Sequence, residues 1–213
     1  MTRTFSFLFL FLFLASCGKG GGGSSSSGSM AELTDAEIAS DSVPVQAQTF
    51  DVHANLSGFS RDQEDKIYKA IELIKQVIAT PEFKKKVLSK TYKGKKQYVD
   101  NNGLSNAQIY KKLLEGSEVL NPGSDNTMNL NLESYFVSAN VIGYTKPSIT
   151  TVYLNRKYLN QGSFTTNEVA MNLTHEWLHK LGFKHSVKKT ASRAHSVPYA
   201  IGYIMRSLAA KYD

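Results

Sequence analysis

The chain has 213 residues, of which 41% are hydrophobic and 11% aromatic, and it carries a net charge of +7. This composition suits one ordinary domain with a hydrophobic core and excludes a chain that is disordered throughout. The basic surplus is compatible with a solubilising surface or with an anionic partner. No DNA- or RNA-binding motif accompanies it, so we expect no nucleic-acid partner. A single cysteine excludes an internal disulfide.

Residues 1–16 have the pattern of a secretory signal. Arg3 precedes an apolar run over residues 5–14, which ends in two small residues. The run is shorter than the roughly 20 apolar residues that span a bilayer. Residues 14–17, Leu-Ala-Ser-Cys, resemble the lipobox of bacterial lipoproteins, in which the cysteine is lipidated and becomes the new N-terminus. A plain secretory signal is the alternative.

Residues 17–47 are interpreted as a lipidated Cys17 and a flexible tether. Residues 18–29 are glycine and serine apart from Lys19, a composition that does not pack into a core. The resemblance to lipoproteins implies a membrane anchor in a bacterial cell envelope. Gly18 is not the aspartate that retains lipoproteins at the inner membrane in that family, which implies the outer membrane in a host with two membranes. Secretion is the alternative location.

Residues 48–213 are expected to form one domain in the order strand, helices, strands, helix and a short C-terminal piece. Alternating apolar residues predict a first strand over residues 49–55. Ser60 and Gln63 form a capping-box pattern that opens a helix. A buried stripe is predicted by four residues at helical spacing: Ile67, Ile71, Ile74 and Ile78. Pro81 suits the first turn of the next helix.

The second half of this domain turns from helix to strand and back. Ser105 and Gln108 repeat the capping-box pattern and predict a short helix. Three segments then favour strands: residues 128–137, 140–144 and 149–154. Thr165 and Glu168 form a third capping-box pattern, ahead of a helix expected over residues 166–181. This mixture of elements predicts the α+β class.

The last long predicted helix carries the residues best suited to metal binding and catalysis. His175 and His179 are four residues apart, so their side chains lie about 40° apart around the helix axis and converge on one ion. Glu176 projects beside them, where a carboxylate can take a proton from water. Gly182 suits the left-handed turn that ends a helix. The chain then doubles back, and His185 can supply a third ligand.

The run from His175 to His185 is similar to the H-E-x-x-H-x-x-G-x-x-H signature of the metzincins, a clan of zinc endopeptidases. The resemblance implies a zincin-like catalytic domain: a mixed twisted sheet, an active-site helix and a very short C-terminal subdomain. It also implies one Zn²⁺ per chain, held by His175, His179 and His185. Glu176 becomes the base that activates a zinc-bound water. The implied partner is a peptide or protein substrate.

The chain departs from metzincins after the third histidine. Those enzymes place a methionine in a tight turn there, whereas Met205 lies in a segment typical of a terminal helix. We expect the bend near residues 196–199 instead, and membership of a named branch stays open. Tyr199 or Tyr203 can stabilise an oxyanion, as tyrosines do in some of these enzymes, and core packing explains either equally well.

The sequence leaves alternatives open for the substrate and for the function. We expect an extended peptide along a sheet edge, with residues 149–154 as the candidate edge strand. Four basic residues flank the site as solvated charges, or favour acidic substrates: Lys184, Lys188, Lys189 and Arg193. The alternatives to an endopeptidase are a zinc-dependent amide hydrolase of the cell wall and a non-catalytic zinc-binding surface lipoprotein. Glu176 argues against the last, because a structural zinc site needs no adjacent base.

Overall fold

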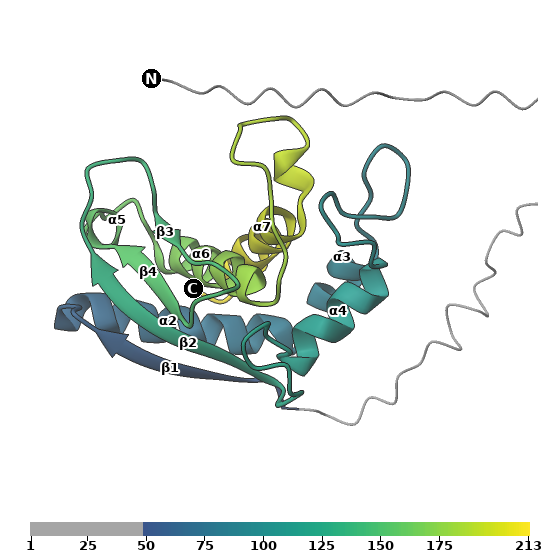
Figure 1. Ribbon diagram of the computed structural model, residues 1–213. Coiled ribbons are helices and arrows are strands. Elements are labelled where there is room, and N and C mark those ends of the chain that lie inside the picture. Colours follow the sequence, from purple (N-terminus) through teal and green to yellow (C-terminus); the bar gives the residue numbers. More distant parts are fainter. Residues whose placement is uncertain (1–48) are drawn as a thin grey trace, which may run out of the picture. The chain divides into compact units, whose positions relative to one another are not determined.

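The computed structural model describes residues 49–213. The predicted signal over residues 1–16, the lipidation site Cys17 and the tether over residues 17–47 lie outside the described residues. Within residues 49–213, a mixed sheet of four strands packs against six helices, which confirms the α+β class (Figure 1). No helix in this part of the chain is long and apolar enough to cross a membrane.

The sheet contains β1 (Asp51–Ser57), β2 (Thr127–Tyr135), β3 (Gly143–Tyr144) and β4 (Thr151–Asn155), in the spatial order β1-β2-β4-β3. β1, β2 and β4 run parallel, and β3 pairs antiparallel with β4. Alternate side chains enter the core, as the period of two predicts, including Val52, Leu130, Leu132, Val152 and Leu154. The first predicted strand is therefore confirmed.

The predicted edge strand is wrong. β4 lies between β2 and β3 and is hydrogen-bonded on both sides, and residues 149–150 precede the strand. The edge beyond β4 is the two-residue strand β3, which falls within the predicted segment 140–144. Alternation of side chains indicates which face of a strand is buried, but it carries no information on which strands are neighbours.

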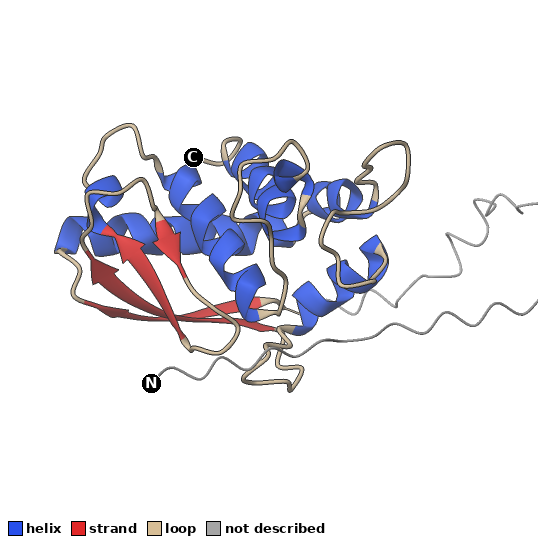
Figure 2. Cartoon of the chain, turned by 45° about the horizontal axis from the view of Figure 1, so that its top comes forward, coloured by secondary structure: helices blue, strands red, loops and turns tan. Residues whose placement is uncertain are grey.

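The helices are α2 (Arg61–Ile78), α3 (Pro81–Leu88), α4 (Asn106–Glu115), α5 (Arg156–Leu159), α6 (Thr166–Lys180) and α7 (Val197–Ala209), with a 3₁₀ turn η1 (Arg193–His195). Most of them lie on one side of the sheet (Figure 2). The predicted isoleucine stripe of α2 is buried at all four positions. α6 packs against both α2 and α7, so the helix that carries the histidines lies in the interior.

Two of the capping boxes form, and the third does not. In α4, the backbone N–H of Ser105 donates to Gln108 Oε1 at 2.9 Å, and the N–H of Gln108 donates to Ser105 Oγ at 3.2 Å. At α6, Thr165 makes no side-chain cap, and Glu168 Oε1 accepts from Arg206 Nη1 of α7 at 3.0 Å. An ion pair between two packed helices has replaced the local bond.

Within the described residues, η1 and α7 follow His185. Met205 lies inside α7 and is fully buried, rather than in a turn. The chain bends at Ser196, which is extended, and Pro198 occupies the first turn of α7. This bend returns the chain to α6 beside the histidines.

Candidate metal centre

The structure brings together the three histidines that the sequence singled out. The rings of His175 and His179 have centroids 5.0 Å apart, and the ring of His185 lies 5.1 Å and 4.9 Å from them. One ring nitrogen from each residue lies within 4.8 Å of the other two. This group can hold a metal ion.

A left-handed glycine places the third histidine. α6 ends at Lys180, and Gly182 has φ 95°, which an L side chain rarely adopts. The N–H of Gly182 donates to His179 O at 2.9 Å, and the N–H of Phe183 donates to Leu178 O at 3.1 Å. The predicted glycine turn is therefore confirmed, and it directs the chain back towards the face of α6 that carries the other two histidines.

Backbone carbonyls orient two of the imidazoles. His179 Nδ1 donates to Phe183 O at 2.8 Å, and His185 Nδ1 donates to Ser186 O at 3.0 Å. Because a carbonyl oxygen only accepts, Nδ1 carries the proton and Nε2 presents a lone pair. Carbonyl partners of this kind commonly orient histidines that bind a metal.

The spacing of the ligand atoms fits a tetrahedral ion. His175 Nε2 lies 3.2 Å from His185 Nε2. Two nitrogens bound to Zn²⁺ at about 2.0–2.1 Å in a tetrahedral arrangement are roughly 3.3 Å apart. A metal ion between two unprotonated Nε2 atoms is compatible with this separation. The three-imidazole donor set therefore fits a metal ion such as zinc.

Burial keeps these histidines neutral. It lowers the pKa of His175 well below the ordinary value of 6.5, and the neighbouring His179 and His185 lower it further. Burial also lowers the pKa of His179 and of His185. Imidazoles that stay unprotonated at neutral pH are in the form that binds a metal.

Glu176 lies beside the histidines in a buried position, with 4% of its surface exposed. Burial raises its pKa to about 8, while the side-chain amide of Asn172 and the backbone N–H of Thr145 act to lower it. Asn172 Nδ2 lies 3.4 Å from Glu176 Oε1. A cation held by the three histidines would favour the charged carboxylate.

The edge strand β3 approaches α6 through a glycine. A Cβ atom on Gly143 would lie 2.7 Å from Asn172 Oδ1 and 2.9 Å from the carbonyl oxygen of Tyr153. Side chains do not come this close, so a larger residue would collide with the backbone of β4 and displace the side chain of Asn172. Gly143 therefore leaves room for the Asn172 amide beside Glu176.

α7 places one of the two candidate tyrosines against the histidines. The ring centroid of Tyr199 is 4.5 Å from that of His175 and 4.7 Å from that of His185. Tyr203 lies one turn later, 5.9 Å from Tyr199, with 38% of its surface exposed. The structure therefore distinguishes two tyrosines that were equivalent in the sequence.

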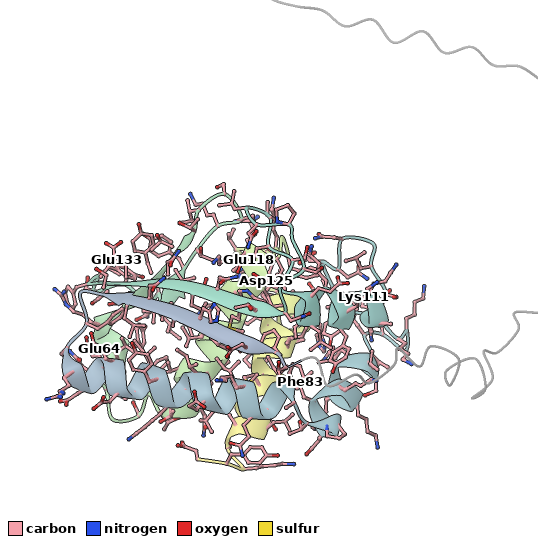
Figure 3. All side chains as sticks on the ribbon, turned by 90° about the horizontal axis from the view of Figure 1, so that it is seen from below. Glu64, Phe83, Lys111, Glu118, Asp125 and Glu133 are labelled. Atoms are coloured by element: carbon pink, nitrogen blue, oxygen red, sulfur yellow. The ribbon has the colours of Figure 1, made fainter. Side chains whose placement is uncertain are left out.

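Sequence reasoning missed a buried ion pair at the end of α6. Lys180 Nζ lies 3.0 Å from Glu118 Oε2, and these side chains are only 4% and 5% exposed. Glu118 Oε1 accepts from Trp177 Nε1 at 3.0 Å and from the backbone N–H of Asn129 at 3.3 Å. Glu118 lies beside the sheet (Figure 3). Because Glu118 and Trp177 are 59 residues apart, no local spacing in the sequence indicates this network.

The chain was compared with protein families, curated proteins and solved structures. No family model matches it, and no curated protein or solved structure matches it significantly. The chemistry of the site is therefore the basis for its function.

Proposed function

We propose that the chain is a single-zinc endopeptidase with a zincin-like fold. The observation that carries the proposal is the convergence of three neutral imidazoles with a buried carboxylate beside them. Within residues 49–213, three side chains form this group, whereas a structural zinc site is closed by four protein ligands. One position is then left for water. The metzincin-like run His175–His185 supports the same conclusion.

The residues of the chain divide the chemistry between them. Bound zinc would supply a Lewis acid that lowers the pKa of a water from 15.7 to about 7 and polarises the substrate carbonyl. The histidines would hold the ion, and the carbonyls of Phe183 and Ser186 keep two of the rings in position. Glu176 accepts the proton of the attacking water on its carboxylate and delivers it to the leaving nitrogen. The amide of Asn172 holds Glu176 Oε1.

The substrate is expected to lie along β3. This strand is the sheet edge nearest α6, and the backbone N–H of Thr145, directly after it, acts on Glu176. An extended peptide that pairs with an exposed edge gains main-chain hydrogen bonds, and these place its scissile bond beside the carboxylate. We assign Tyr199 as the candidate donor to the oxyanion, because its ring contacts two of the three histidines.

Digestion of two kinds of amide tests the reaction class. Zinc-loaded protein is incubated with a mixed peptide library and, separately, with purified bacterial cell wall. We expect cleavage of internal peptide bonds in the library, read by mass spectrometry. Release of wall fragments without peptide cleavage would instead make the protein a wall amide hydrolase.

The purified protein is expected to contain one zinc per chain, and His185→Ala is expected to lose it. Loss of a direct ligand should weaken zinc binding by more than the roughly 10–100-fold that loss of a supporting residue costs. Metal analysis after dialysis measures the content. His195→Ala is the control, because the ring of His195 packs on Tyr92 with centroids 4.9 Å apart, outside the group of three. Full zinc occupancy in His185→Ala would show that the third ligand lies elsewhere.

We also propose that Cys17, outside the described residues, anchors the protein to a membrane of the bacterial envelope. Expressed in a bacterium, the wild type is expected in the membrane fraction, and Cys17→Ala as unprocessed or soluble protein. Ser24→Ala, which alters the Gly/Ser segment but leaves residues 14–17 intact, should behave as the wild type. Recovery of the wild type wholly as a soluble, unlipidated species would make the signal a plain secretory one.

A further inference from the structure

Arg193 is held next to the metal centre by an aromatic ring. Its guanidinium carbon lies 4.6 Å from the centroid of the Tyr199 ring. That ring in turn contacts His175 and His185. A guanidinium over an aromatic face is attracted by the ring quadrupole, which limits its movement. The cation is therefore kept close to the histidines.

The guanidinium of Arg193 forms no salt bridge within residues 49–213. None of the ion pairs in this part of the chain includes it. Its Nε is buried and has no hydrogen-bond partner. Arg206 differs, because its Nη1 donates to Glu168 at 3.0 Å. A buried donor without a partner is rare in folded proteins and calls for an acceptor from elsewhere.

Among the basic residues of this region, Arg193 is the one that acts on the histidines. Lys184, Lys188 and Lys189, on the segment between α6 and η1, are exposed to solvent. The charge of Arg193 lowers the pKa of both His175 and His185, so it acts directly on the metal centre. Asp100 acts in the opposite direction and raises the pKa of His185, but it forms no ion pair with Arg193. A bound divalent ion would increase the positive charge further.

We propose that Arg193 is the receptor for a carboxylate of the substrate, so that the site prefers peptides with an acidic group next to the scissile bond. This inference rests on the proposed peptidase function. A guanidinium offers two parallel N–H groups that match the two oxygens of a carboxylate, and such bidentate pairs are strong and directional. The carboxylate is supplied either by the C-terminus of a peptide or by an aspartate or glutamate side chain.

Binding to full-length Glu176→Gln protein loaded with zinc tests the receptor separately from catalysis. Three peptides of one sequence are compared by calorimetry: a C-terminal acid, its C-terminal amide, and the amide with one alanine replaced by glutamate. We expect at least one carboxylate peptide to bind about 10-fold more tightly than the neutral amide. The tighter of the two identifies which carboxylate the site recognises.

Variants of two basic residues test whether Arg193 causes the preference for carboxylate peptides. Arg193→Gln should abolish it, and Arg193→Lys should retain part, because lysine keeps the charge without the planar fork. Lys189→Gln removes one charge from the same segment and should keep the preference. Zinc content equal to that of the parent shows that each variant retains the metal centre.

Three results would overturn the inference: equal affinity for acid and amide in the parent, persistence of the preference in Arg193→Gln, or its loss in Lys189→Gln. Peptide hydrolysis by the wild type is measured separately. If Arg193 governs binding but the wild type cleaves no peptide, the receptor stands and the proposed peptidase function fails.

Discussion

Glu176→Gln is expected to lower the rate of peptide hydrolysis by about 10²–10⁴-fold, the usual contribution of a general base. Glutamine keeps the shape of the side chain and an oxygen that can accept from Asn172, but it cannot accept the proton of the attacking water. Glu176 is not one of the three residues that could hold a metal ion, so zinc content and thermal stability should stay close to those of the wild type.

Hydrolysis and metal content are measured on the same purified samples of wild type and variant. Glu168→Gln is the matched control, because it makes the same change on the same helix, where the carboxylate pairs with Arg206. It should leave the hydrolysis rate nearly unchanged. Equal rates for wild type and Glu176→Gln would remove Glu176 from the mechanism.

Glu118→Ala is expected to destabilise the fold by about 3–5 kcal/mol, because it leaves the Lys180 ammonium buried without a counter-charge. The change also removes the acceptor of Trp177 Nε1 and of the Asn129 N–H. Urea denaturation, with the transition midpoint and slope fitted together, measures the loss. Lys180 is exposed to water in the unfolded state. The unpaired ammonium therefore raises the free energy of the folded state alone.

Two further variants check the cause of that loss. Glu115→Ala removes an exposed partner of Lys111 at 3.7 Å, on α4, and should cost less than about 1 kcal/mol. Glu118→Gln combined with Lys180→Met removes both charges but keeps an acceptor for Trp177, so it should recover most of the stability. If Glu118→Ala lowered the free energy of unfolding by less than about 1 kcal/mol, the buried Glu118–Lys180 pair would not be essential to the fold.

The features predicted correctly are those with local determinants. The isoleucine spacing of α2, the four-residue spacing of His175 and His179, and the left-handed turn at Gly182 each depend on a few neighbouring residues. Helix geometry alone converts these spacings into a shared face. The predicted and observed ends of α6 consequently differ by one residue.

The features that were missed depend on contacts between distant segments. Glu168 pairs with Arg206, which lies 38 residues away in the sequence, instead of forming the local capping box. The neighbour order of β3 and β4 and the Glu118–Lys180 pair also arise only when the chain has folded. Tyr199 and Arg193 could be placed near the histidines from the sequence, but their relative positions required the packing of α7 on α6.

Titration of metal-free protein with zinc tests the central claim most directly. Chelator-treated protein is mixed with increasing zinc, and cleavage of a peptide identified from the library is measured at each step. We predict that activity is absent without metal, rises linearly and reaches a plateau at one zinc per chain. Bound zinc at one per chain without hydrolysis of any peptide, or activity that chelation leaves unchanged, would contradict a single-zinc peptidase.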